Sequence, residues 1–127
     1  MQIIAHEDAD GICSAALVRM SDPSSRIFFS KPCGLMHDLD QMDSRKDLMV
    51  LDLALCELAK EQIVSRLSRW RGKVLYIDHH PDTATSFPRQ SSVEVIAGTV
   101  SSSELTFTHL APRLKREAER VMVITHP

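Results

Sequence analysis

The sequence predicts an α/β domain with a Rossmann-like, mostly parallel sheet that carries helices on both faces. Short apolar runs alternate along the chain with segments of helical periodicity, and each apolar run is almost continuous. A continuous run is expected of a strand covered on both faces, and alternation of strands with helices is typical of a doubly wound sheet. We predict strands at residues 2–5, 26–30, 48–53, 73–77 and 93–97, with a further one at 121–125.

Helices are predicted at residues 11–20, 34–42, 57–70, 103–110 and 113–120, while residues 81–92 are predicted to form a loop. The first helix ends before Asp22-Pro23, because proline cannot continue a helix. The helix at 57–70 is the clearest, since Gly72 follows it where a C-terminal cap is expected. Its apolar residues form one stripe: Leu58, Ala59, Ile63, Leu67 and Trp70.

Composition indicates a single domain over residues 1–127. The chain is 43% apolar and 25% charged, which is ordinary for a globular domain with its own core. Its formal charge of −2 argues against binding nucleic acid through bulk positive charge, although a local basic groove is compatible with it.

The sequence shows no sign of secretion or membrane insertion. No leader is visible, and no apolar stretch reaches the roughly 20 residues of a transmembrane helix. The cysteines, Cys13, Cys33 and Cys56, are an odd number without metal-type spacing. We therefore expect a cytoplasmic protein with reduced cysteines and no membrane association.

Three of the predicted strands end in acidic and imidazole side chains. In a parallel sheet, ligands bind beyond the carboxyl ends of the strands, so these groups are expected to meet at one edge. We predict a metal site there. Its candidate residues are His6, Asp8 and Asp10 after the first strand, Asp52 after the third, and Asp78-His79-His80 after the fourth.

The chemistry of these residues favours hard divalent cations. Carboxylates with one or two imidazoles suit Mn²⁺ or Mg²⁺, and also Zn²⁺ or Fe²⁺. Several carboxylates could not stay uncompensated in one cleft, and two divalent cations would neutralise them. Two ions about 3.5–4 Å apart suit phosphoryl hydrolysis, because one generates hydroxide and both stabilise the attacking and leaving oxygens.

Each group taken alone also has an ordinary structural explanation. An aspartate such as Asp52 often caps the following helix. A single histidine such as His6 is more often structural, and Asp10-Gly11 alone is a common turn. Together these explanations are poor, because all three groups fall at strand ends and all carry hard ligands.

The three groups, in this order, resemble the first three motifs of the DHH phosphoesterase superfamily. The resemblance covers residues 3 to about 110. The run from His6 to Ala16 is most similar to archaeal RecJ-like members, and residues 101–105 resemble a helix start in NrnA-type oligoribonucleases. The superfamily also includes cyclic-dinucleotide phosphodiesterases and family II pyrophosphatases.

The resemblance implies a role for each candidate residue. It makes Asp8, Asp10, Asp52 and His79 ligands of Mn²⁺ or Mg²⁺, with Asp52 as the bridge between two ions. His6 is a further candidate ligand, whose spacing to the acids differs between branches of the family. His80 is expected near the scissile phosphate, as a phosphate contact or proton donor, and Asp78 is expected to orient a histidine.

The chain departs from the family pattern in two respects. The family's fourth motif is an aspartate downstream of the helix that begins near Ser103, and this chain has no aspartate after Asp82. We also expect the family's second, substrate-gripping domain to be absent. Both departures bear on catalysis, although the remaining ligands are still compatible with one bound ion.

Three functions are compatible with this pattern. The favoured one is a RecJ-like phosphoesterase that hydrolyses phosphodiester bonds in single-stranded or short oligonucleotides through hydroxide activated by two metal ions. The alternative is a catalytically impaired homologue that serves as a binding or scaffold subunit, with a protein partner or as a homo-oligomer, in a nucleic-acid-processing complex. A phosphatase of pyrophosphate or a dinucleotide is the third, and the sequence does not separate it from the first.

Basic and aromatic residues offer possible contacts to nucleic acid. A solvated helix face is the favoured interpretation of both basic clusters. Phe28 and Phe29 are expected in the core, and Phe87 is the better candidate to stack on a base. The first basic cluster is Arg66, Arg69, Arg71 and Lys73, and the second is Arg113, Lys115, Arg116 and Arg120.

Overall fold

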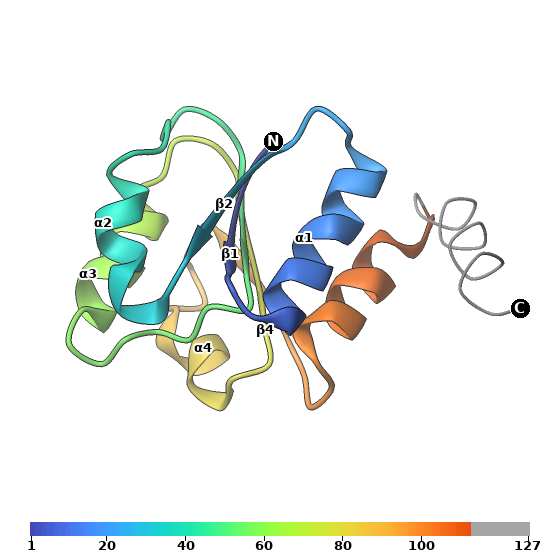
Figure 1. Cartoon of the computed structure of the whole chain (residues 1–127). Coiled ribbons are helices and arrows are strands. Elements are labelled where there is room, and N and C mark those ends of the chain that lie inside the picture. The colour runs from blue at the N-terminus through green and yellow to red at the C-terminus, as the bar shows by residue number, and fades with distance from the viewer. Residues whose placement is uncertain (113–127) are drawn as a thin grey trace, which may run out of the picture.

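The computed structural model describes residues 1–112 and contains a five-stranded, all-parallel sheet with helices on both faces (Figure 1). The predicted α/β, Rossmann-like fold class is thereby confirmed. The strands are β1 (Gln2–His6), β2 (Arg26–Ser30), β3 (Leu48–Leu51), β4 (Val74–Asp78) and β5 (Val93–Ala97), in the order β2-β1-β3-β4-β5. The predicted helix at 113–120, the predicted strand at 121–125 and the second basic cluster lie outside the described residues.

Two helical layers cover the sheet. On one face lie α1 (Ala9–Ser21) and a helix at residues 102–112, and on the other lie α2 (Leu35–Leu39) and α3 (Lys60–Ser68) (Figure 1). A short 3₁₀ helix, η1 (Pro32–Gly34), leads from β2 into α2, and α4 (Pro81–Ser86) follows β4. Within residues 1–112, no helix is long and apolar enough to cross a membrane.

Each face of the sheet has its own buried core, because successive side chains of a strand point to opposite faces. On the face covered by α1, the buried residues are Ile3, Ala5, Ala15, Val18, Met49, Leu51, Ile77 and Leu110. On the other face they include Ile4, Leu35, Leu39, Leu48, Val50, Ile63, Leu67, Trp70 and Tyr76. Each fully buried leucine or isoleucine contributes about 1.5–3 kcal/mol. The strands therefore form a well-packed base for the polar groups at their carboxyl ends.

The strand order places a topological switch point between β1 and β3. The chain leaves β1 toward β2 on one side, and all later strands lie on the other side. In doubly wound sheets, ligands bind at the carboxyl ends of the strands that flank such a point. The first and second groups of candidate ligands follow β1 and β3, respectively.

The connection from β3 to α3 differs from the prediction. β3 ends at Leu51, since Asp52 has a φ of 60°, which is incompatible with an extended strand. α3 begins only at Lys60, so Leu58, predicted to face inward, is 94% exposed. Trp70 is buried as predicted, but it lies beyond the end of α3, where its indole N–H donates to the carbonyl of Lys46 at 2.8 Å.

The predicted loop at 81–92 instead begins with α4. Pro81 occupies its first turn, where no helical amide hydrogen bond is lost, and the Ser86 hydroxyl donates to the carbonyl of Asp82 at 2.5 Å. Phe87 then turns inward and packs on Tyr76, with ring centroids 5.7 Å apart. Phe87 is buried, so the prediction that it stacks on a base is wrong. Phe29, expected in the core, is instead 46% exposed.

The expectation of three reduced cysteines is also corrected. Cys33 in η1 and Cys56 in the connection after β3 form a disulfide, with Cα atoms 5.2 Å apart, while Cys13 is free and exposed. The two cysteines are 23 residues apart in sequence. They meet because both segments leave the same edge of the sheet, and spacing along the chain does not reveal this.

Candidate metal centre

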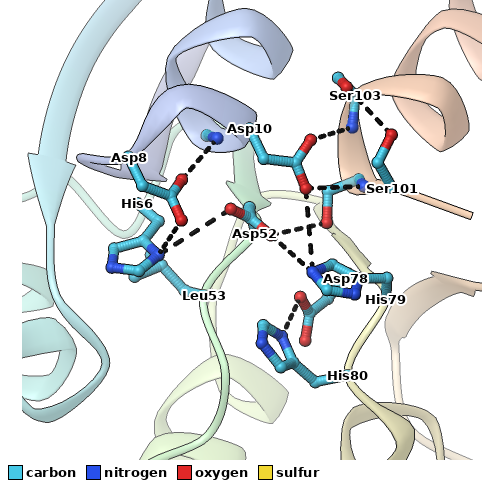
Figure 2. A network of polar contacts seen from close by, with 12 residues as sticks. His6, Asp8, Asp10, Asp52, Leu53, Asp78, His79, His80, Ser101 and Ser103 are labelled. Carbon is cyan, nitrogen blue, oxygen red and sulfur yellow. Dashed lines mark hydrogen bonds and ion pairs between the residues drawn. The ribbon is translucent and has the colours of Figure 1, made fainter.

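The three groups of candidate ligands meet at one edge of the sheet (Figure 2). Leu51 of β3 pairs with Ala5 of β1 on one side and with Ile77 of β4 on the other. Asp52, the next residue, therefore lies between His6 and Asp78. Burial on both faces fixes this register, because a slip of one residue would turn each side chain to the opposite face.

Asp52 is the central residue of the site. Its backbone N–H donates to the carbonyl of Ile77 at 2.9 Å, and its side chain is only 2% exposed. The left-handed φ of Asp52 costs about 1–2 kcal/mol for an L-residue. In this conformation the carboxylate lies between the neighbouring strand ends. The Ser102 hydroxyl donates to Oδ1 of Asp52 at 2.9 Å, which fixes the side chain.

His6 and Asp8 form one side of the site. The Nδ1 atom of His6 lies 3.1 Å from Oδ2 of Asp8 and 3.9 Å from Oδ2 of Asp52. Asp8 also caps α1, since its Oδ1 accepts the N–H of Gly11 at 2.8 Å. Gly11 is required here, because a Cβ at this position would collide with the carbonyl oxygen of His6. The cap therefore holds Asp8 beside the imidazole.

Asp10 and His79 form a second side. The Nε2 atom of His79 lies 3.3 Å from Oδ1 of Asp52 and 3.8 Å from Oδ2 of Asp10. Asp10 accepts two backbone N–H groups, from Ser102 at 3.0 Å and from Ser103 at 2.8 Å (Figure 2). It thus caps the helix at 102–112, whose N-terminus favours negative charge. This contact joins two segments more than 90 residues apart.

Asp78 and His80 form the third part of the site. Asp78 is completely buried, and its Oδ1 lies 2.6 Å from Nδ1 of His80. Its other oxygen accepts the Thr83 hydroxyl at 2.6 Å. Because a carboxylate can only accept, Nδ1 of His80 is the donor in this pair. The opposite ring nitrogen is then left available, while the rings of His79 and His80 lie 4.4 Å apart between centroids.

Among the carboxylates of the site, Asp52 has a raised pKa. Burial raises its pKa to about 7, and the neighbouring carboxylates of Asp8 and Asp10 act in the same direction. Burial also opposes ionisation of Asp8 and Asp10, but hydrogen bonds outweigh it and lower the pKa of both, from Gly11 to Asp8 and from Ser103 and Ser102 to Asp10. The cluster is therefore one in which a bound cation would favour ionised Asp52.

The donor atoms lie close enough together to hold a metal ion. Ligand atoms of His6, Asp8 and Asp52 lie within 4.8 Å of one another, and so do those of Asp52, Asp78, His79 and His80. Asp52 belongs to both groups. Asp10 lies beside them, within 3.8 Å of His79, but is not a member of either group. All seven candidate residues are thus found at one edge of the sheet.

Several residues of the site were not predicted from the sequence. Ser102 and Ser103 were expected only to begin a helix, and their contacts to Asp52 and Asp10 depend on tertiary packing. Thr83 was placed in a loop, and no local signal links it to Asp78. The first basic cluster is partly paired, since Arg66 lies 2.5 Å from Asp40.

Neither a comparison with protein-family models nor a comparison with curated proteins returns a match for this chain.

Proposed function

We propose that the chain is a metal-dependent phosphoesterase of the DHH type, hydrolysing phosphodiester bonds in single-stranded or short oligonucleotides. The observation that carries the proposal is the position of Asp52, a buried carboxylate that belongs to two groups of metal-ligating atoms. The order of the motifs in the sequence supports the same assignment. The choice of an oligonucleotide over pyrophosphate or a dinucleotide rests on the resemblance to RecJ-like proteins.

In this proposal the centre holds two Mn²⁺ or Mg²⁺ ions. Carboxylate oxygens dominate the donor set, imidazoles complete it, and the centre contains no thiolate. His6, Asp8 and Asp52 would hold one ion, and Asp52 with His79 would hold the other, beside Asp10. Bound divalent cations would polarise the phosphoryl oxygens and lower the pKa of an attacking water.

His80 and Asp78 supply the protein's own proton chemistry in this proposal. The carboxylate of Asp78 fixes the ring of His80 through Nδ1, and Thr83 fixes Asp78 in turn. The Nε2 atom of His80 would then contact the scissile phosphate or donate a proton to the leaving oxygen. His80 remains 38% exposed, so a substrate can reach it.

The test is manganese-dependent release of mononucleotides from a short single-stranded oligonucleotide. Wild type should cleave only with Mn²⁺ or Mg²⁺, and Asp52→Asn should show only background release. Asp40→Asn is a matched control, because Asp40 is 52% exposed and lies in an ion pair with Arg66. Equal release by wild type and Asp52→Asn would contradict the proposal.

A binding or scaffold role is the alternative, and one observation favours it. Residues 83–127 contain no aspartate, the residue type of the fourth motif in the family that the chain resembles. Metal content discriminates between the two functions. Two bound ions favour the enzyme, whereas a chain that binds no Mn²⁺ while forming a stable complex with a protein partner favours the scaffold.

A further inference from the structure

The segment at residues 31–34 connects the two loops that carry one of the ligand groups. Lys31 pairs with Glu7, with Nζ 3.2 Å from Oε1. Two residues further along, Cys33 is joined to Cys56 by the disulfide. Glu7 stands between His6 and Asp8, and Cys56 follows Asp52 by four residues. We call residues 31–34 the strap.

The strap is held unequally at its two ends. The ion pair of Lys31 with Glu7 is exposed, with side chains 73% and 47% accessible, so it contributes little by itself. The covalent bond at Cys33 is therefore the stronger attachment. The base of the strap is fixed separately, because the Ser30 hydroxyl donates to Asp38 at 2.5 Å.

Asp52 does not depend on the disulfide alone. Ile77 and Ser102 hold Asp52 directly, and the Tyr76 hydroxyl donates to the carbonyl of Leu53. Beyond Leu53, the connection turns outward, and Leu58 is 94% exposed. The disulfide is therefore expected to restrain residues 54–59 and, through them, the side of Asp52 that faces His6. Its loss should weaken this ligand group without dismantling it.

The two cysteine residues differ in exposure in a way that favours thiol exchange at Cys33. Cys33 is exposed, whereas Cys56 is 9% exposed. A small thiolate can attack the sulfur of Cys33, which breaks the protein disulfide and releases Cys56 as a thiolate that takes up a proton. A second thiol then releases Cys33 as a thiol, and the two small thiols leave as their disulfide. The reverse exchange with an oxidised small thiol restores the link.

We propose that Cys33–Cys56 is a thiol–disulfide exchange site that sets the metal affinity of the group formed by His6, Asp8 and Asp52. The proposal deepens the proposed function and rests on the metal site assigned there. Oxidation ties the segment that follows Asp52 to the strap, and reduction frees that segment. The expected change in Mn²⁺ affinity is about three- to tenfold, below the roughly 10–100-fold typical of removing a partner that contacts a ligand directly.

The test compares Mn²⁺ binding by isothermal titration calorimetry for the full chain in two states. One sample is oxidised with glutathione disulfide, and the other is reduced with a phosphine that is then removed under anaerobic conditions. Alkylation and mass spectrometry count the free thiols in each. We expect one free thiol and tighter binding in the oxidised sample, and three free thiols and weaker binding in the reduced one. Cys33→Ser should bind like the reduced sample, and Cys13→Ser should respond to redox state like wild type.

The outcomes separate this inference from the proposed function. Equal, measurable affinity in both redox states overturns the exchange site alone and leaves the metal site standing. Three free thiols after oxidation also overturn it. Absence of Mn²⁺ binding in both states overturns the metal site, and the exchange site with it. If Cys33→Ser does not fold, the reduced wild-type sample still decides the question.

Discussion

The two halves of the metal centre share Asp52 but are built differently. In the half with His6 and Asp8, His6 ends β1, and Asp8, which caps α1, is 50% exposed. The half with Asp78 and His80 starts inside a strand, and Asp78 is fully buried with both oxygens hydrogen-bonded. The first half is thus open to solvent and bound to an exposed strap, while the second is fixed by the core. The proposed function therefore places adjustable ion binding in the first half and rigid geometry in the second.

The largest effect is expected for Asp52→Asn, because this residue serves both halves. Mn²⁺ affinity should fall by at least about 100-fold, and nucleolytic activity should fall to background. The fold should survive, since asparagine tolerates a positive φ and its amide oxygen can accept from Ser102. Calorimetric titration and a circular dichroism melt check these outcomes, with Asp40→Asn as the control. Wild-type affinity in the variant would show that Asp52 is not a ligand.

Reduction of the disulfide is expected to lower the free energy of unfolding. A cross-link between residues 23 apart removes loop-closure entropy from the unfolded chain, which corresponds to about 3 kcal/mol. The reduced protein should therefore unfold at lower denaturant concentration than the oxidised one. Urea titrations followed by tryptophan fluorescence measure this, because Trp70 is the chain's single, buried tryptophan. An unchanged midpoint in the reduced protein would show that the link does not stabilise the fold.

Asp78→Asn should lower the turnover number while leaving Mn²⁺ affinity nearly unchanged, which distinguishes the roles of the two halves. The amide can donate to Nδ1 of His80, which would shift the ring proton to the other nitrogen and disturb its orientation. The turnover number should fall about 10–100-fold, while Mn²⁺ affinity should change by less than about threefold. Thr83→Val removes only the other hydrogen bond to Asp78 and should have a smaller effect. Equal losses of affinity and turnover in Asp78→Asn would make Asp78 a direct ligand.

A further effect is expected on the pH dependence of stability without metal. Burial raises the pKa of Asp52 to about 7, above its value of about 3.8 in the unfolded chain, so the folded state holds the proton more tightly. Between about pH 4 and pH 7 the unfolded state binds fewer protons, and this residue's contribution to stability must fall as pH rises. Melting temperatures across this range, in chelator and then in excess Mn²⁺, measure it.

Asp52→Asn is the control for the pH experiment. The variant has no carboxylate at this position, so this component of the pH dependence should disappear in chelator. Excess Mn²⁺ should offset the fall in wild type, because the cation favours the ionised form. A pH profile that is the same in wild type and variant would show that Asp52 ionises normally.

The fold was largely predictable, because it follows from local patterns. All five strands in the described residues begin within one residue of their predicted start, since continuous apolar runs are a direct consequence of burial on both faces. The predicted strand ends then gave the positions of the acidic and imidazole side chains. The shortening of β3 escaped prediction, because it follows from the positive φ of Asp52.

The supporting residues of the site were less predictable. Ser102 contacts Asp52 across 50 positions of the sequence, and Thr83 contacts Asp78 from a helix that was not predicted. The sequence pattern therefore indicated neither contact. The pairing of Cys33 with Cys56 depends equally on two segments that leave one edge of the sheet. The candidate ligands at the strand ends can be predicted from the sequence pattern, whereas the residues that contact them depend on the tertiary fold.

The most direct test of the account is the number of Mn²⁺ ions bound at pH 7.5, measured by native mass spectrometry with metal analysis of the same sample. Sharing of Asp52 between two ligand groups predicts two ions in the wild-type chain and neither at full occupancy in Asp52→Asn. A wild-type chain that binds no ion, or a variant that still binds two, would contradict it.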